Sequence, residues 1–366
     1  MAKNRRKGIR FPKIESRSLK YGYSNARAKA MKGLVLAPAI LEEMIKVRSI
    51  HGMIDLLNRT PYRKEVNDHA IREHGIKLVE MAIAQRFINM AQRIFKITPK
   101  DDQPIVKALL KKWDLVMLQM LINAKRAGKS KEELKPYLMA ITPEYRKGLE
   151  IIASAEDVFS AFKKTQIGHN IMENSVSSMS KDMEKRFRKA TAAGDKLGQI
   201  EMMLEIYRYN HVQTAFADEA PDVQRVHKIL RREIDIRNIT TIERLKKKGQ
   251  EGKAIEEYLI EGGMLPQRTL KRLLTAKDLQ EVLERLKFYW GEITLEEQTT
   301  IGLEIALEKT LAKEKVKAFH RSVLSLGALL SVMLILEEEV HNIRKIAKAK
   351  EFGLSEDEVR KTLVVI

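Results

Sequence analysis

The sequence has no cysteine and few aromatic residues, which make up 6% of its 366 residues. Without cysteine, disulfide bridges and thiolate metal sites are excluded, and a reducing, intracellular compartment is expected. The longest uncharged stretch, Ser322–Leu336, has fifteen residues, fewer than the ~20 that a membrane-spanning helix needs. It is therefore predicted to form a buried core helix. The first apolar run follows Lys32, so no secretory signal is expected.

Recognisable catalytic motifs are also absent. The sequence has no Gly-x-x-x-x-Gly-Lys phosphate loop, no His-Glu-x-x-His and no Gly-x-Ser-x-Gly. His69 and His74 are five residues apart, so one helix face would not present both to a metal ion. Gly262-Gly263 could cradle a phosphate, but a turn ahead of Pro266 is the simpler interpretation. We predict no catalytic residue, no metal site and no cofactor, and expect a protein that is not an enzyme.

What the sequence has in excess is positive charge. The formal net charge is +19, and residues 1–32 hold eleven Lys and Arg against one acid, which gives 11 − 1 = +10. A basic arm of this kind suits nucleic acid, an acidic protein or anionic lipid, and charge alone does not choose among them.

One helical pattern recurs three times. Each copy has an acid, aliphatic residues at helical spacing, a lysine and a terminal glycine. The copies carry, in order, the acids Asp114, Asp235 and Glu339, the lysines Lys125, Lys246 and Lys350, and the glycines Gly128, Gly249 and Gly353. Glycine suits a helix C-terminus because it adopts the left-handed conformation freely, and lysine suits the negative end of the helix dipole.

A second block also recurs, with Ser49, Asp157 and Asp278 just before its last aliphatic residue. These side chains are predicted to cap helix N-termini. Prolines fall mostly between the helical patterns, and no long stretch alternates with the period of a strand. We therefore predict an all-α fold. It has a basic N-terminal arm and helix (1–36) and three related helical units (37–147, 148–268 and 269–366).

The segment Tyr21–Lys32 resembles the N-terminal signature of a known family, the C subunits of archaeal A-type and bacterial V-type ATP synthases. The counterpart in eukaryotic vacuolar ATPases is the d subunit. The triplicated frame, the Glu261-Gly262-Gly263 segment and the C-terminal Gly-Leu-Ser-Glu-Asp-Glu-Val run are similar to this family as well.

The resemblance runs from about Leu19 to Leu363, and residues 1–18 extend beyond it. The first frame departs from the pattern, because Met117 stands where the other copies carry Asn238 and Asn342.

The resemblance implies three helical subdomains in a pseudo-threefold funnel. It also implies a non-catalytic central-stalk subunit that passes torque between the rotor shaft (subunits of D and F type) and the membrane proteolipid ring. Such a subunit would serve ATP synthesis and ion transport as a peripheral protein on the cytoplasmic face of the membrane. It would also touch the membrane surface and take no nucleic acid and no small-molecule substrate.

The repeated acids and lysines are the first candidate site. Each acid lies within the apolar stripe of its helix, eleven residues or ~16 Å from its lysine, so the two do not pair with each other. We favour a structural role, in which each acid pairs with an arginine or lysine of another helix. The functional alternative places these side chains around a central cavity, facing the shaft. Arg27 and Lys29 on the opening helix are further candidates for partner binding.

Two other functional classes remain open. A basic helical-repeat protein could bind nucleic acid, but the excess charge lies at one end and base-stacking aromatics are few. An enzyme with an unrecognised site is the third class, and no residue cluster supports it.

Overall fold

The computed structural model describes residues 17–176, 181–216 and 220–364, and all of its regular elements are helices. The first group is α1 (Arg17–Lys32), α2 (Pro38–Lys46), α3 (Ile50–Leu57), α4 (Arg63–Ala70) and α5 (Gly75–Ile97). The second is η1 (Lys100–Asp102), α6 (Gln103–Arg126), α7 (Lys131–Leu134), η2 (Lys135–Leu138), α8 (Pro143–Ser154), α9 (Val158–Lys164), α10 (Gln166–Val176), α11 (Lys181–Ala192) and α12 (Lys196–Phe216). The third is α13 (Pro221–Lys247), α14 (Lys253–Glu256), α15 (Gln267–Leu274), α16 (Leu279–Trp290), α17 (Thr300–Arg321), α18 (Leu326–Glu351) and α19 (Glu356–Thr362). The predicted all-α class is confirmed.

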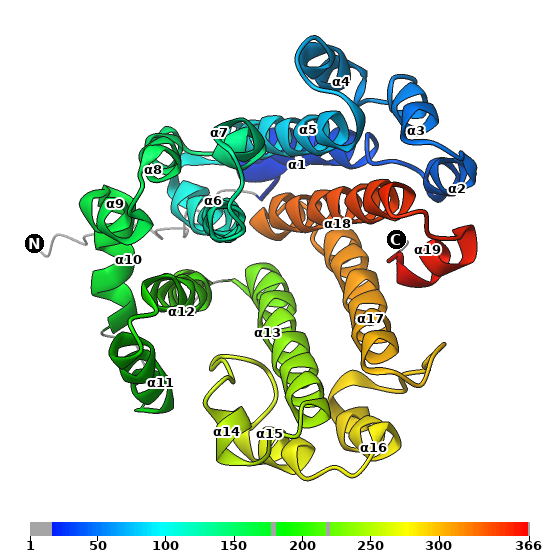
Figure 1. Ribbon diagram of the computed structural model, residues 1–366. Helices are drawn as coiled ribbons and strands as arrows, with labels where there is room; N and C mark the ends of the chain where they lie inside the picture. Colours follow the sequence, from blue (N-terminus) through cyan, green and yellow to red (C-terminus); the bar gives the residue numbers. More distant parts are fainter. Residues whose placement is uncertain (1–16, 177–180, 217–219, 365–366) are drawn as a thin grey trace, which may run out of the picture.

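Long helices occupy the middle of the molecule and short helices its rim (Figure 1). The three copies of the repeated frame form α6, α13 and α18, which all lie near the centre. Shorter helices such as α2–α4, α9–α11 and α14–α16 surround them. The basic residues before Arg17 lie outside the described residues.

Each long helix ends at its glycine, as predicted. Gly128, Gly249 and Gly353 have φ values of 72°, 75° and 68°, which a side chain at Cβ would disfavour. The residue after each glycine donates its N–H to a carbonyl five residues back, at 2.9–3.1 Å. This bond closes the helix end in a Schellman motif.

Each long helix packs against the short helix that comes next in the repeated pattern. α6 packs against α8, and α13 packs against α15. The partner of α18 is α2, so the last copy of the pattern joins the first short helix of the chain. The ranges 37–147, 148–268 and 269–366 remain a prediction of how the pattern divides along the chain, and the packing crosses their borders.

The interior is divided among one central apolar cluster and two large outer ones. The central cluster joins residues from α5, α6, α13, α17 and the first half of α18. Every residue from Leu326 to Val340 is buried, which confirms the predicted core helix from Leu326 onward. The first four residues of the predicted stretch instead form a loop in which Val323 is 57% exposed. None of the described helices is both long and apolar enough to cross a bilayer.

The opening helix α1 is held across the body by its Tyr-x-x-Ser-Asn residues. The Tyr21 hydroxyl donates to Asp102 at 2.7 Å, and Ser24 donates to the carbonyl of Ile97 at 2.5 Å. Asn25 makes two hydrogen bonds with the backbone of Ser325, at 3.1 and 3.2 Å. The family-like signature of this segment therefore docks α1 beside the starts of α6 and α18.

Candidate functional site

The three repeated acids are fully buried and hold the chain just before a short helix. Asp114 accepts hydrogen bonds from the Ile141 amide and the Thr142 hydroxyl, at 2.6 and 2.9 Å. Asp235 accepts from the amides of Met264 and Leu265, at 3.1 and 3.0 Å. In the third copy, Glu339 accepts from the Leu36 amide and the Tyr62 hydroxyl. Each acid thus binds the segment that leads into α8, α15 or α2.

The three repeated lysines hold the opposite ends of the same short helices. Lys125 donates to the carbonyls of Ala153 and Ala155, at 2.9 and 2.7 Å. Lys246 donates to the carbonyl of Ala276 at 2.6 Å, and Lys350 donates to those of Ile45 and Val47. A positive charge at a helix C-terminus satisfies its free carbonyls and its dipole.

Each acid and lysine pair therefore forms an end clamp, which grips one short helix at both ends. The ~16 Å that separates acid from lysine along the long helix is close to the length of the short helix. We expected each acid to pair with an arginine or lysine, but Asp235 and Glu339 accept from backbone amides and a hydroxyl. That the six clamp residues contact a partner stays a prediction.

A second clamp is present in the last two copies only. The Asn238 amide makes two hydrogen bonds with the backbone of Ile260, both at 2.8 Å. Asn342 does the same with Val364, at 2.7 and 3.0 Å. In the first copy the equivalent position is Met117, whose side chain has no amide group and does not form these two hydrogen bonds.

The Gly262-Gly263 segment forms a turn that lies against the Asp235 carboxylate. A Cβ atom added to Gly263 would lie 2.2 Å from Oδ1 of Asp235. Arg231 supports the turn by donating to the carbonyls of Gly262 and Gly263, at 2.9 and 2.6 Å. These two carbonyls are thus bound by a cation within the chain, and the segment forms the predicted turn.

Gly263→Ala is expected to lower the free energy of unfolding by about 1–3 kcal/mol, because the added methyl group overpacks the clamp. Urea unfolding followed by circular dichroism measures the change. Gly22→Ala is the matched control, since a Cβ at that helical position meets no atom within 4 Å. Equal effects of the two substitutions would contradict the proposed contact.

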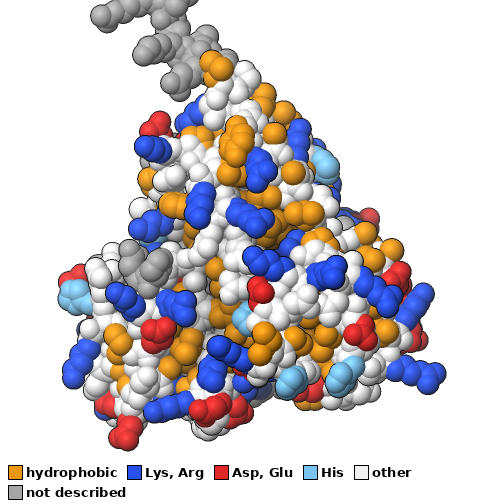
Figure 2. All heavy atoms as spheres, turned by 90° about the horizontal axis from the view of Figure 1, so that it is seen from above, with side chains coloured by type: hydrophobic (Ala, Val, Ile, Leu, Met, Phe, Trp, Pro, Cys, Tyr) orange, Lys and Arg blue, Asp and Glu red, His pale blue; other side chains and the backbone are white. Residues whose placement is uncertain are grey.

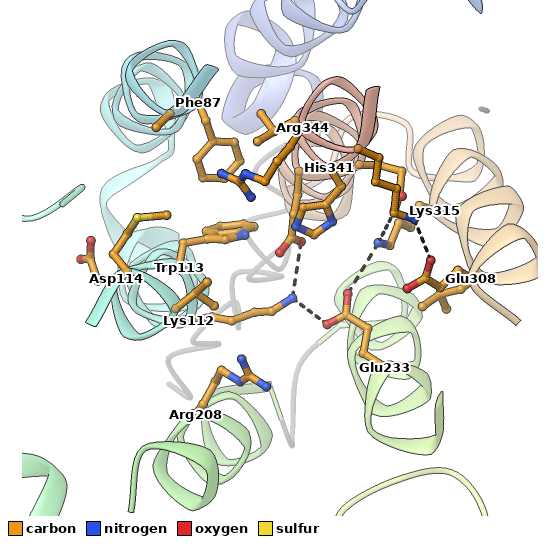
Figure 3. Close-up of a pocket in the computed structure, with 18 of the residues that line it drawn as sticks. Phe87, Lys112, Trp113, Asp114, Arg208, Glu233, Glu308, Lys315, His341 and Arg344 are labelled. Carbon is orange, nitrogen blue, oxygen red and sulfur yellow. Dashed lines mark hydrogen bonds and ion pairs between the residues drawn. The ribbon is translucent and has the colours of Figure 1, made fainter. Parts of the chain in front are cut away.

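A cavity of about 480 Å³ lies where the long helices meet. Its walls come from α5, α6, α12, α13, α17 and α18, and they carry charged side chains of both signs (Figure 3). Phe87 and Trp113 form an aromatic wall, with ring centroids 4.9 Å apart. The Arg344 side chain points toward them (Figure 3).

Equivalent residues of the three copies meet at this cavity. Lys112, Glu233 and Glu337 each stand two positions before the repeated acid. The Lys112 ammonium lies 2.6 Å from a Glu233 oxygen and 3.4 Å from a Glu337 oxygen. Lys315 of α17 adds contacts to Glu338 at 3.0 Å and to Glu233 at 3.6 Å. We call these five residues the central ion cluster.

Mutual attraction keeps Lys112 and Glu337 charged despite their burial. Burial alone would lower the pKa of Lys112, but Glu233 and Glu337 outweigh it and raise this pKa. Burial likewise favours a raised pKa for Glu337, yet Lys112 and Lys315 hold that pKa below its ordinary value. These two side chains therefore form an ion pair, and neither is a free acid or base.

Sequence reasoning did not identify this cluster. Lys112, Glu233 and Glu337 lie on the face of each long helix opposite the apolar stripe, a position that usually faces solvent. The available signal was that one position, two before the acid, is charged in all three copies. In the described part of the chain, no three His, Asp or Glu side chains are grouped as metal ligands would be.

The other two candidates, Arg27 and Lys29, are exposed on α1. They lie apart from the six clamp residues, so the predicted site residues do not form one site. The structure brings them together only as three separate end clamps and one exposed helix face.

Fold and site together define an all-α repeat protein whose copies converge on a buried, charged centre. The chain belongs to the ATP synthase (C/AC39) subunit family, whose model matches residues 24–362. ATP synthesis and ion transport are the processes that this family serves.

Relatives of similar length support this assignment. The chain is 24% identical to the C subunit of the A-type ATP synthase of Methanococcoides burtonii, and the match covers 95% of both chains. It is 22% identical to the C subunit of Archaeoglobus fulgidus, over 94% of this chain and 96% of the relative. The match to the C subunit of Desulfurococcus sp. has 24% identity and covers 96% of this chain and 93% of the relative. The predicted family is confirmed.

Proposed function

We propose that this chain is a non-catalytic central-stalk subunit of an A-type ATP synthase. It connects the rotor shaft, made of D-type and F-type subunits, to the membrane proteolipid ring, and it lies peripherally on the cytoplasmic face of the membrane. The family match over residues 24–362 carries this proposal. The relatives named as C subunits of A-type ATP synthases support it, since they match along nearly their whole length.

We also infer that the three copies are arranged around a pseudo-threefold axis, as in a funnel. The contacts of Lys112, Glu233 and Glu337 support this inference, because a threefold axis brings equivalent residues of three copies close to one another. The cavity lies at the same place. Its charged walls suit a polar protein segment such as the end of a shaft.

A torque-transmitting part must be stiff, and the end clamps supply stiffness. The three clamped short helices, α8, α15 and α2, are each bound at both ends to a long helix of the centre. Buried, satisfied polar contacts of this kind oppose sliding between helices, because any shift leaves a donor or acceptor unpaired. Force applied at the cavity would therefore reach the rim without large internal rearrangement.

A pull-down from detergent-solubilised membranes of the source organism tests the proposal. The immobilised full-length chain is expected to retain D-type and F-type shaft subunits and a small proteolipid, identified by mass spectrometry. Retention of nucleic acid alone, lost at moderate salt, would instead favour the nucleic-acid-binding alternative.

One substitution sharpens this experiment. Arg344→Glu places a negative charge in the cavity wall and is expected to reduce retention of the shaft subunits while the proteolipid is still retained. The control is Arg63→Glu, which changes the charge by the same amount at an exposed position on α4. A shaft that binds both variants equally would not enter this cavity.

A further inference from the structure

The helix α1 has two faces, and within the described part of the chain one of them packs against the body. Ser24, Asn25, Ala28 and Met31 are buried against the body. On the other side, Leu19 is 83% exposed and Tyr23 is 69% exposed. Exposed apolar side chains of this size are unusual unless something covers them.

The exposed residues form a regular strip along α1. At about 100° per residue, the four side chains of this strip lie within about 60° of one another around the helix axis. They are Leu19, Tyr23, Ala26 and Ala30, and all are exposed. Arg27 and Lys29 lie about 80° to either side of Leu19, and both are exposed. We call these six residues the outward strip.

The charged side chains of α1 itself all have one sign. The helix α1 contains no acidic residue, and residues 1–32 carry +10 of the total charge of +19. In the loop that receives Asn25, Val323 and Arg321 are exposed as well. Figure 2 shows hydrophobic and basic side chains over the narrow end of the molecule, whereas most acidic side chains lie over the broad end.

We propose that the outward strip of α1 lies on an anionic lipid surface. A narrow apolar strip with a cation on each side matches a helix at the membrane interface, where leucine enters the acyl boundary and tyrosine stays at the headgroups. The flanking cations then meet lipid phosphates. The strip combines exposed apolar side chains with flanking cations, which suits a lipid surface, with its phosphates and acyl chains, better than an acidic protein loop, which offers charge alone. This inference deepens the proposed function, since it names the part of a peripheral subunit that meets lipid.

Co-sedimentation of the purified full-length chain with vesicles tests the inference. Vesicles of phosphatidylcholine mixed with phosphatidylglycerol are compared with vesicles of phosphatidylcholine alone, at low and high salt. We expect binding to the anionic vesicles only, and weaker binding at high salt because the ions screen the headgroup charge.

Two variants then separate the parts of the outward strip. Replacing Arg27 and Lys29 together by glutamine is expected to weaken binding about 30-fold, from ~1 kcal/mol per basic residue near the surface. Replacing Leu19 and Tyr23 together by alanine is expected to weaken it about tenfold. The control replaces exposed Arg63 and Lys64 of α4 by glutamine, with the same loss of charge, and is expected to bind like the wild type. Circular dichroism of each variant checks that the helix content is retained.

Binding that is unchanged in both α1 variants, and so is carried by the basic residues before Arg17 alone, would overturn the inference. Equal losses in the control would also overturn it, because the attraction would then be general. The vesicles contain no proteolipid ring, and the pull-down contains no bilayer. A failure of either experiment therefore leaves the other result standing, and the two proposals fail separately.

Discussion

Lys112→Met is expected to lower the free energy of unfolding by about 3–5 kcal/mol, the usual cost of removing one partner from a buried ion pair. Methionine matches the length of the lysine side chain, so little packing is lost. The loss instead comes from Glu233 and Glu337, which each lose the ion pair that Lys112 makes with them in the wild type. Urea unfolding at neutral pH measures this difference.

The pH dependence of stability provides a second measurement of the same substitution. In the wild type, the pKa of Glu337 is lower in the folded protein than in the unfolded chain. The unfolded chain therefore binds more protons on acidification, and stability falls as the pH drops below the ordinary carboxyl range. Without Lys112 this pKa rises, so the loss of stability in acid becomes smaller. Lys107→Met, at an exposed position of the same helix, is the control. An effect of the two substitutions that is equal at every pH would contradict the role of the cluster.

Asp235→Ala is expected to lower the free energy of unfolding by about 2–4 kcal/mol, because two buried amides lose their acceptor. The amides belong to Met264 and Leu265, in the segment that leads into α15. Burial raises the pKa of Asp235 to about 6, although both amides oppose this rise. The Asp235 carboxyl thus binds its proton more tightly in the folded protein than in the unfolded chain. Its contribution to stability therefore falls as the pH rises through 6.

The alanine variant should lack that contribution to the pH profile. Its loss of stability relative to the wild type is therefore expected to be greater near pH 5 than near pH 7. Asp55→Ala, at an exposed position of α3, is the control and should change the free energy of unfolding by less than about 0.5 kcal/mol. Thermal and urea unfolding at both pH values provide the measurement. A loss that is the same at both pH values would show that Asp235 does not titrate in this range.

Features that depend on a few neighbouring residues were predictable from the sequence. Ser49, Asp157 and Asp278 each accept a hydrogen bond from an amide in the first turn of the following helix, as predicted. The repeated glycines likewise end their helices with positive φ. Both features follow from the free amides and carbonyls at any helix end. No knowledge of the tertiary fold is needed to predict them.

The partners of the buried acids were not predictable in the same way. An acid within an apolar stripe must have a partner, but the sequence does not show which donor the fold will bring to it. For Asp235 the donors lie 29 and 30 residues further along the chain. They are backbone amides, which every residue except proline has, so no residue type marks them.

The central ion cluster was hidden for a different reason. Lys112 lies about 200° around the helix from Asp114, on a face that would meet solvent if α6 were alone. It is buried only because α13, α17 and α18 also reach the centre. This burial arises only when the long helices pack together, so the sequence pattern of one helix does not predict it.

The pairing of α2 with α18 joins the two ends of the chain, and this has a consequence for biosynthesis. Glu339 and Lys350 hold residues that were made 303 and 305 positions earlier. At roughly 5–20 residues per second, α2 waits about 15–60 s on the ribosome before its partner exists. During that time its apolar residues Leu41, Met44 and Ile45 lack the α18 surface against which they are finally buried.

The helices α2 and α18 therefore complete one layer of the core together, only after α18 has been synthesised. A nascent chain stopped anywhere before α18 would carry an unfinished N-terminal region as well as a missing C-terminus. Exposed apolar surface in such a fragment favours aggregation and recognition by chaperones. The burial of α2 thus depends on the synthesis of α18, nearly 300 residues later in the chain.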